Sequence, residues 1–493
     1  MPIYFKITFW LFLTLPLDTY SQVYAPLPIV IKNVELEAKI ENQYLIELEK
    51  ISSLNKAQKK IVTGAYLSRK KFISELLSLG DFIFEGDVYN KIQEVFARIS
   101  KQNPEETKNV TILLSRSAVP NAFNTGDNFI VVNLGLILRL QNEDQLAFIL
   151  CHELSHQLKQ HGNKRIQLNA IDQTDANAIA QKKKEVAKIL RSEYRIASKM
   201  DSLFIPGMMN KMQHSRMIEY EADSVGLSLL KLSGYNVAHS ATLLKILDKS
   251  DRDIFDYDPN LEEVLNYINI PFNLDWIEYE EVSSLGYFEK KKSELEDSLK
   301  THPDCPKRIQ RLRYLDSSIP EVETWEIDKI DVSFLPLKKE SELEIIQSFL
   351  YLENLGRAFF YCIYPLHKNP NDAYLNVSMA RILAELAVAK KNRTIGKYVS
   401  TTNYDYTNHY NKTLRFLWNS SSEDCMKLSN EFIAKSQGAS KSESYWVHSI
   451  MSNYYNSEKP NFLHNYKSFL EKYPNSQSKG KLEILNEKVK LLN

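Results

Sequence analysis

The spacing of hydrophobic positions changes along the first third of the chain. Residues 22–105 carry charged amphipathic stretches such as ELEAKIENQYLIELEKI, which predict helices. Two short runs rich in β-branched residues follow, Val110–Leu114 and Phe129–Val132, with Gly and Asn residues between them. These runs predict two strands joined by a turn region.

A helical pattern begins at Asn142, a good N-cap residue followed by Glu143 and Asp144. Four leucines then recur on one stripe: Leu146, Leu150, Leu154 and Leu158. Gly162 is expected to end this helix. A second amphipathic helix is predicted from about Ser215 to Leu232, stopping near Gly234. The Lys-rich stretch 163–200 between them favours a solvated helix over a surface that collects acidic partners.

Helical hairpins are predicted after about residue 335. Pro370 and Pro474 lie in similar sequence surroundings and are 104 residues apart, about three repeats of the 34-residue tetratricopeptide period. We therefore expect a tetratricopeptide-like helical array over 335–493, an architecture that mostly presents concave protein-binding surfaces.

The first 21 residues have the layout of a secretory signal peptide, with an apolar run Ile7–Leu17 and Ser21 at the expected cleavage point. The alternative is an uncleaved anchor. No later window reaches the length of a membrane span, so we expect a mature chain without one, exported to the periplasm or secreted, and at most peripheral to the outer membrane.

Composition narrows the possible functions. Lys+Arg and Asp+Glu are equal at 62 each. Nucleic-acid binding usually requires an excess of basic residues, so the composition does not support it. Four cysteines in 493 residues do not make a disulfide scaffold. Cys362 and Cys425 could pair, and Cys151 is expected to be buried filler.

The stretch 151–161 reads CHELSHQLKQH and lies on the first predicted long helix. His152 and His156 are four apart, so they share a face and can aim at one point. Glu153 can reach a metal-bound water. This HExxH pattern supplies two zinc ligands and a base, and a catalytic zinc needs a third ligand. The alternative is a helix that happens to carry two histidines.

The second helix, within HSRMIEYEADSVG (214–226), offers that ligand. Glu219 and Asp223 are four apart on one face, so one can bind zinc while the other accepts a hydrogen bond from a ligand histidine. Glu221 is expected on the opposite side. Alone, the segment would be a solvated acidic face; beside HExxH, the metal site is favoured.

Together these motifs resemble the zinc metallopeptidases of the CAAX prenyl protease and HtpX type over about residues 80–315. The family pattern S-R-x-x-E-x-x-A-D is matched in full from Ser215 to Asp223. The resemblance implies one Zn²⁺ per chain on His152, His156 and Glu219, with Glu153 as general base and Asp223 orienting a ligand histidine.

Two further segments share the resemblance. The segment Asn121, Ala122 and Phe123 precedes a Gly-containing strand, and in the family such an edge strand holds the substrate backbone. In THPDCPKRIQRL, His302 and Arg308 are implied to stabilise the oxyanion.

The absence of later spans departs from the membrane-embedded branches. The combination of signal peptide, peptidase and tetratricopeptide-like region resembles the periplasmic BepA-type branch, associated with outer-membrane protein quality control, in which the late histidine can cap the zinc. His302 is the candidate for this role. His161 and His214 are expected to be surface or cap residues.

We therefore expect a mainly α fold with a small β-sheet: a zincin-like metallopeptidase domain at 22–320, helical to about 105, followed by a helical repeat array at 335–493. The expected function is zinc-dependent endopeptidase action on exported, misfolded or outer-membrane proteins, with assembly partners of those proteins bound through the repeats. The alternative is a protein-binding chaperone or scaffold with a silent or gated peptidase site.

Overall fold

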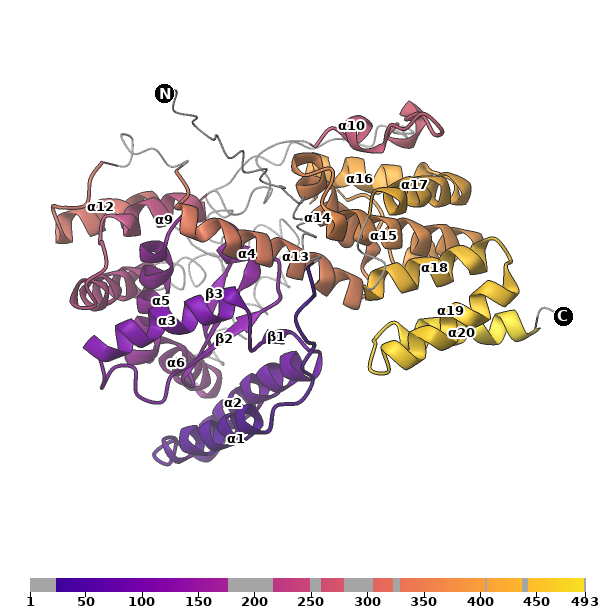
Figure 1. Ribbon diagram of the computed structural model, residues 1–493. Helices are drawn as coiled ribbons and strands as arrows, with labels where there is room; N and C mark the ends of the chain where they lie inside the picture. Colours follow the sequence, from indigo (N-terminus) through magenta and orange to yellow (C-terminus); the bar gives the residue numbers. More distant parts are fainter. Residues whose placement is uncertain are drawn as a thin grey trace, which may run out of the picture.

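The computed structural model describes residues 24–175, 216–248, 259–278, 305–321, 329–403, 406–436 and 442–491. The described chain is mainly helical with one four-stranded sheet (Figure 1), which confirms the predicted fold class. The predicted signal peptide, 1–21, and residues 176–200 of the Lys-rich stretch lie outside the described residues. No described helix is both long and apolar enough to cross a membrane.

The sheet has the order β1-β2-β4-β3. Its strands are β1 (Phe82–Ile83), β2 (Thr111–Ser115), β3 (Ala122–Asn124) and β4 (Phe129–Asn133). The two predicted strands are confirmed as β2 and β4, which run parallel. Their connection is more than a turn, because it contains β3, which pairs antiparallel with β4 at the edge of the sheet.

Helices cover both faces of this sheet. Side chains of β2 and β4 alternate between the faces, as a pleated strand requires. Leu113 and Val131 pack with the hairpin of α1 (Val34–Glu49) and α2 (Lys56–Ser78). Leu114 and Val132 belong to the main core, with α3 (Asp87–Gln102) and α5 (Glu143–Leu158).

Helix α5 starts where the sequence predicts. The Asn142 side chain accepts a hydrogen bond of 3.0 Å from the backbone N–H of Gln145. The prediction that Gly162 ends the helix is wrong. The chain turns two residues earlier at Gln160, which adopts a left-handed conformation with φ 52°, and Gly162 lies inside the next helix, α6 (His161–Thr174).

The second predicted site helix covers residues 216–232, and the turn after it has Gly234 at φ 72°, as expected. The remaining elements of this part of the chain are α4 (Leu134–Ile137), α9 (His239–Asp248), α10 (Leu261–Leu265), η1 (Leu274–Trp276) and α12 (Cys305–Leu315).

The C-terminal part is entirely helical where it is described. Its elements are η3 (Val332–Phe334), α13 (Leu335–Tyr351), α14 (Leu355–Lys368), α15 (Ala373–Lys391), η4 (Ile395–Lys397), α16 (Asn408–Asn419), α17 (Ser422–Lys435), α18 (Glu443–Tyr455), α19 (Lys459–Lys472) and α20 (Lys479–Leu491).

Two hairpins in this part share their turn geometry. Glu353 between α13 and α14, and Ser457 between α18 and α19, both have positive φ, at 55° and 62°. These residues are 104 residues apart, the same separation as Pro370 and Pro474, which follow the second helix of each hairpin. The chain therefore returns to the same local geometry after 104 residues.

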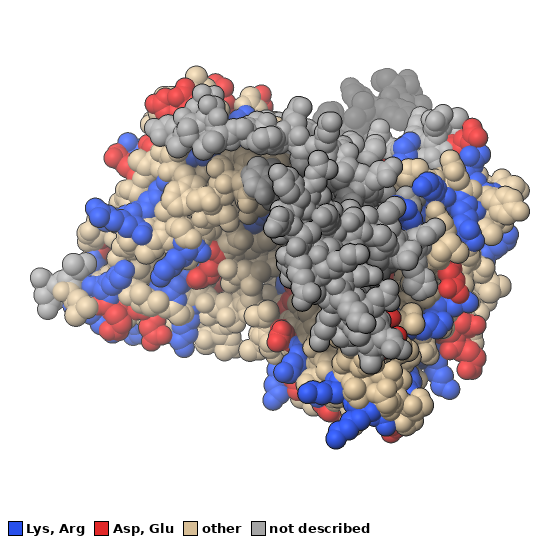
Figure 2. Space-filling model, turned by 180° about the vertical axis from the view of Figure 1, so that it is seen from behind, with Lys and Arg blue, Asp and Glu red and all other residues tan. Residues whose placement is uncertain are grey.

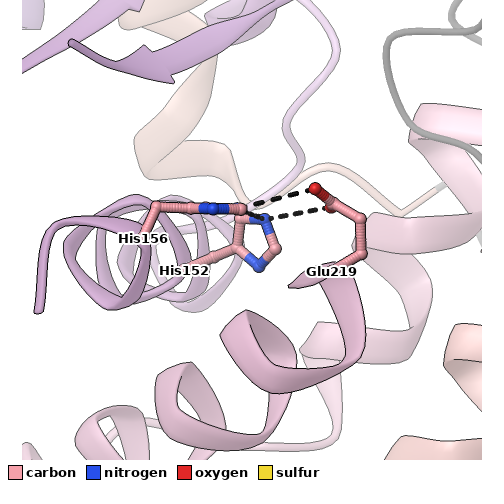
Figure 3. Close-up of side chains that lie close together, drawn as sticks. All are labelled: His152, His156 and Glu219. Carbon is pink, nitrogen blue, oxygen red and sulfur yellow. Dashed lines mark hydrogen bonds and ion pairs between the residues drawn. The ribbon is translucent and has the colours of Figure 1, made fainter. Parts of the chain in front are cut away.

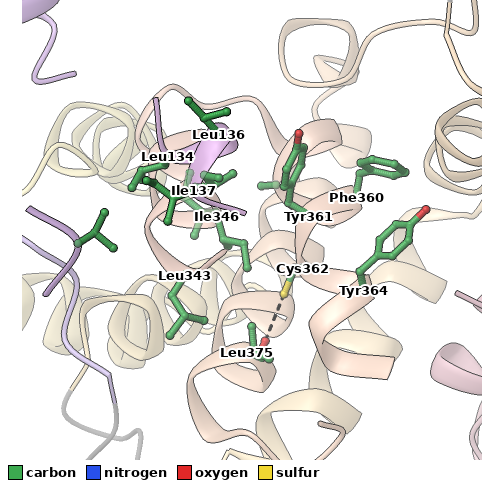
Figure 4. Close-up of a cluster of buried hydrophobic side chains, with 14 of the residues drawn as sticks. Leu134, Leu136, Ile137, Leu343, Ile346, Phe360, Tyr361, Cys362, Tyr364 and Leu375 are labelled. Carbon is green, nitrogen blue, oxygen red and sulfur yellow. Dashed lines mark hydrogen bonds between the residues drawn. The ribbon is translucent and has the colours of Figure 1, made fainter. Parts of the chain in front are cut away.

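The two parts share one hydrophobic core. Leu134, Leu136 and Ile137 of α4 lie beside Leu343 and Ile346 of α13 (Figure 4). Polar contacts reinforce this junction.

Arg116, at the end of β2, forms a fully buried ion pair with Glu344 of α13. Glu340 of α13 accepts hydrogen bonds from the backbone N–H groups of Asp87 and Val88, at 2.9 and 3.0 Å. It thereby satisfies donors at the start of α3 that the helix itself leaves unpaired.

The distribution of surface charge and the state of the cysteines can be compared with the sequence-based predictions. On the face in Figure 2, basic and acidic side chains are interspersed over the described surface. All four cysteines are described, and all are buried and free. The pairing considered for Cys362 and Cys425 therefore does not occur. Cys151 is buried, as expected.

Candidate active site

Three side chains of the kinds that can ligate a metal converge between α5 and the helix over 216–232 (Figure 3). The Nε2 atoms of His152 and His156 are 3.1 Å apart. They lie 3.5 and 3.6 Å from the Glu219 carboxylate oxygens. One donor atom from each residue lies within 4.8 Å of the others. Two imidazoles and a carboxylate are a known ligand set of catalytic zinc sites, so the residues present fit a metal ion.

Local sequence explains this convergence. Positions four apart stack on one face of α5, which aligns His152 and His156. The opposing helix approaches closely at Gly226, where an added Cβ would lie 3.1 Å from the backbone N and Cα of His152. A residue with a side chain would push the helices apart, so the glycine brings Glu219 within reach.

Asp223 holds His152 from behind. Its Oδ1 lies 3.0 Å from His152 Nδ1, while Nε2 of the same ring faces the ligand cluster. Arg308 of α12 holds Asp223 in turn: its Nε and one terminal nitrogen each donate a hydrogen bond of 2.7 Å to the two carboxylate oxygens. Such outer-shell hydrogen bonds fix the tautomer and orientation of a ligand histidine.

Arg308 also lies 3.2 Å from a Glu219 oxygen through its other terminal nitrogen. Its side chain is 2% exposed. All three guanidinium nitrogens therefore face carboxylates of the site. These contacts give Arg308 a positioning role, and its implied oxyanion role stays a prediction. His302, implied for the same role, lies outside the described residues, as does His214.

Glu153 is buried beside His152, in a pocket formed by α5, β3, α4, α9 and α12. Burial raises the pKa of its carboxyl to about 7, although neighbouring His152 opposes the shift and a hydrogen bond from the backbone of Asn124 in β3 lowers it. The pocket is lined by Ala122, Leu136, Phe148, Ile149, His152, Glu153, Leu243, Leu244, Leu247 and Arg308. It is mostly apolar, so it can exclude water and shelter a proton-transfer group.

The segment predicted to hold substrate lies at this pocket. Ala122 and Phe123 are in edge strand β3, paired with Val132 and Val131 of β4, and Ala122 lines the pocket. Asn121 precedes the strand and accepts a hydrogen bond from the backbone N–H of Asn133. An edge strand has unpaired backbone groups that can bind an extended peptide. Substrate binding here stays a prediction.

The ligand cluster is strongly coupled electrostatically. Burial would lower the pKa of His152, but its contacts with Asp223 and Glu219 outweigh that effect and raise the pKa to about 10. Burial, with His152 beside it, lowers the pKa of His156 to about 3. Burial opposes ionisation of Glu219, but His152 and Arg308 hold the pKa of its carboxyl well below the usual range. The shifts therefore have their causes within the cluster itself, in its burial and in the contacts among the histidines, the carboxylates and Arg308.

His161 corrects the sequence-based expectation. The sequence predicts a surface or cap residue. His161 is the first residue of α6, but it is only 7% exposed, and its Nδ1 lies 2.9 Å from Nδ1 of His156. Its Nε2 lies 3.1 Å from Glu221, whose other oxygen lies 3.1 Å from Lys159. Glu221 is not one of the three clustered residues, but it contacts His161, which in turn contacts His156. Helical spacing does not signal this contact, because His161 lies five residues after His156 and reaches it only through the break at Gln160.

Comparison with known proteins agrees with this geometry. Residues 85–316, slightly less than half of the chain, match Peptidase family M48. No curated protein matches the chain. The matched region contains the three candidate metal ligands, together with Glu153, Asp223 and Arg308. The family match and the site together support a metallopeptidase of the M48 type in this part of the chain.

Proposed function

We propose that the protein is a zinc-dependent metalloendopeptidase that cleaves exported proteins. The observation that carries this proposal is the convergence of His152, His156 and Glu219 within 4.8 Å, beside a buried Glu153. The donor set suits Zn²⁺, and the buried carboxylate suits a general base.

The side chains divide the work of hydrolysis. Zinc, when bound, supplies a Lewis acid and lowers the pKa of water. Glu153 accepts the proton of the attacking water and returns it to the leaving amine, for which a pKa near neutrality is well suited. β3 aligns the substrate backbone by strand addition. Arg308 and His302 are proposed to stabilise the oxyanion, with His302 capping the zinc at rest.

Export and recruitment complete the proposal. The N-terminal signal layout supports export to the periplasm, and the 104-residue recurrence of hairpin geometry supports a tetratricopeptide-like array. We infer substrates among misfolded or outer-membrane proteins, with their assembly partners bound by the array.

A second function is favoured by one feature. A cavity of about 680 Å³ lies between residues 24–29 and the C-terminal helices, lined among others by Tyr351, Tyr374 and Tyr473. A cavity of this size can hold part of a peptide. A chaperone or scaffold that acts through these helices, with a silent or gated peptidase site, would use this surface.

One experiment separates the two functions. Purified parent and Glu153→Gln protein are each incubated with an unfolded outer-membrane protein, and zinc per chain is measured in parallel. The proposal expects one zinc in both and cleavage by the parent alone. Full cleavage by Glu153→Gln protein would overturn the mechanism. A zinc-loaded parent that cleaves nothing, with a Glu153→Gln gene that fully rescues a deletion strain, would favour the scaffold.

A further inference from the structure

The two ligand histidines are supported differently. His152 has a carboxylate, Asp223, 3.0 Å from its Nδ1. His156 has no carboxylate at that place among the described residues. Its Nδ1 faces Nδ1 of His161, at 2.9 Å.

A metal bound to Nε2 of His156 would fix the direction of the hydrogen bonds that connect His156, His161 and Glu221. A ligand imidazole that binds a metal through Nε2 carries its proton on Nδ1. His156 must then donate, so His161 must accept through an unprotonated Nδ1. The single proton of neutral His161 is left on Nε2, which lies 3.1 Å from Glu221 Oε2. Each N–H group in this row of three residues then has an acceptor.

Backbone geometry shows how His161 reaches this place. In an unbroken α-helix, a residue five positions on would lie about 140° around the axis and could not face His156. The left-handed residue Gln160 breaks the helix, and His161 starts α6 directly beside the ligand. The side chain of His161 is 7% exposed and that of Glu221 is 46% exposed, so the chain runs from the buried metal site to solvent.

We propose that His161 and Glu221 form an outer-shell relay that orients His156 for metal binding, with His161 as the positioning residue. Its role for His156 corresponds to the support that Asp223 and Arg308 give to His152. The inference rests on the proposed zinc site and names residues outside the HExxH and SRxxExxAD positions.

The relay predicts a graded loss of zinc affinity. His161→Leu introduces an apolar side chain of similar bulk and removes the acceptor, so zinc affinity should fall about 10- to 100-fold. His161→Gln offers both an acceptor for His156 and a donor for Glu221, and should restore most of the loss. Glu221→Gln keeps an acceptor at the solvent end and should change affinity by less than about threefold, because hydrogen bonds near solvent are worth less.

The test uses the full chain with zinc alone, in competition with a chromophoric chelator, and the visible spectrum of the Co²⁺-substituted protein. The relay predicts the order of affinities above and an altered cobalt spectrum for His161→Leu that His161→Gln largely reverses. His464→Gln, an exposed histidine on α19, is the matched control. Thermal unfolding of the metal-free proteins checks that each variant folds.

Each outcome decides the inference. Zinc affinity and a cobalt spectrum within twofold of the parent for His161→Leu would overturn the relay. So would an affinity as low as that of His156→Ala, because His161 would then be a ligand itself. If His161→Leu does not fold, equal affinities of His161→Gln and His161→Ala would overturn it. A parent that binds no zinc would instead contradict the proposed function.

Discussion

Buried charge is used differently in the peptidase site and in the C-terminal helices. In the helices, the guanidinium of Arg381 donates to Glu385 at 2.8 Å, Ser444 at 3.3 Å and Ser478 at 2.9 Å. Lys481 lies 2.7 Å from the other oxygen of Glu385. The cations and the carboxylate are thus fully occupied with one another, and the network joins α15, α18 and α20.

In the peptidase site, by contrast, the donor atoms of two histidines and one glutamate face one common point. The Nε2 atoms of His152 and His156 face each other and the Glu219 carboxylate, while carboxylates and histidines behind them fix their directions. Two imidazole nitrogens 3.1 Å apart must share a proton or bind a cation. Burial and charge alone therefore do not identify a functional site. The direction of the lone pairs is more informative. In the C-terminal helices the carboxylate oxygens of Glu385 face cations, whereas in the site the lone pairs of His152, His156 and Glu219 face one another.

The largest expected effect comes from the base. Glu153→Gln should lower the rate of peptide cleavage by about 10²- to 10⁴-fold and leave zinc content unchanged, because Glu153 is not a ligand. Cleavage of an unfolded protein and metal analysis measure both. Glu342→Gln, a glutamate of α13, is the matched control and should retain full activity. Loss of zinc in Glu153→Gln protein would contradict the assigned role.

Substitution in the buried charge network of the C-terminal helices should lower the free energy of unfolding and leave the peptidase site unaffected. Glu385→Leu leaves Arg381 and Lys481 buried without their carboxylate, which costs about 3–5 kcal/mol for a broken buried pair. Urea unfolding followed by circular dichroism measures the loss, and zinc affinity should stay unchanged. Glu423→Ala, which breaks the exposed pair with Lys427, is the control and should have no measurable effect. An equally stable Glu385→Leu protein would show that the network is not needed.

His448 in α18 predicts a pH effect on the C-terminal helices. Burial lowers the pKa of His448 to about 4, and neither ring nitrogen has a hydrogen-bond partner among the described residues. Unfolded, its pKa is about 6.5, so the unfolded state binds the proton more readily between these values. Stability should therefore fall as pH drops from about 6.5 to 4, by about 3 kcal/mol in total.

This effect can be isolated by substitution. In His448→Leu protein the difference in unfolding free energy between pH 7 and pH 4 should shrink by that amount. The exposed His464→Leu variant should behave like the parent. An unchanged pH profile in His448→Leu protein would show that other groups cause the acid sensitivity.

The smallest predicted effect concerns helix spacing. Gly226→Ala introduces a Cβ about 3.1 Å from the backbone of His152, so the two site helices must separate by a few tenths of an ångström. We expect a loss of about 1–3 kcal/mol in stability and weaker zinc binding. Gly64→Ala, where an added Cβ meets no atom within 4 Å, is the matched control. Zinc affinity unchanged in Gly226→Ala protein would mean that the site tolerates this shift.

The sequence predicted the parts of the site that follow from local geometry. Helical spacing placed His152 with His156, and Glu219 with Asp223, because positions four apart share a face. Cap chemistry placed the start of α5 at Asn142. The strands at Val110–Leu114 and Phe129–Val132 were found from their β-branched residues.

Other features depend on tertiary contacts and were missed. The role of His161 depends on a left-handed Gln160, a conformation that glutamine rarely adopts and that its sequence surroundings did not signal. The contacts of Arg308 with Asp223 and Glu219 join helices 85 residues apart, and periodicity gives no information on such pairs. The parallel pairing of β2 with β4 likewise required knowledge of where β3 lies.

Two glutamates, one in the candidate metal site and one in the C-terminal helices, give the most direct test of the metal site. Zinc per chain and unfolding temperature are measured for the parent, Glu219→Ala and Glu385→Ala. We expect one zinc in the parent, none in Glu219→Ala protein that is still folded, and one zinc in Glu385→Ala protein with a lowered unfolding temperature. Full zinc in Glu219→Ala protein, or none in the parent after reconstitution, would contradict the claim that α5 and the helix over 216–232 form a metal site.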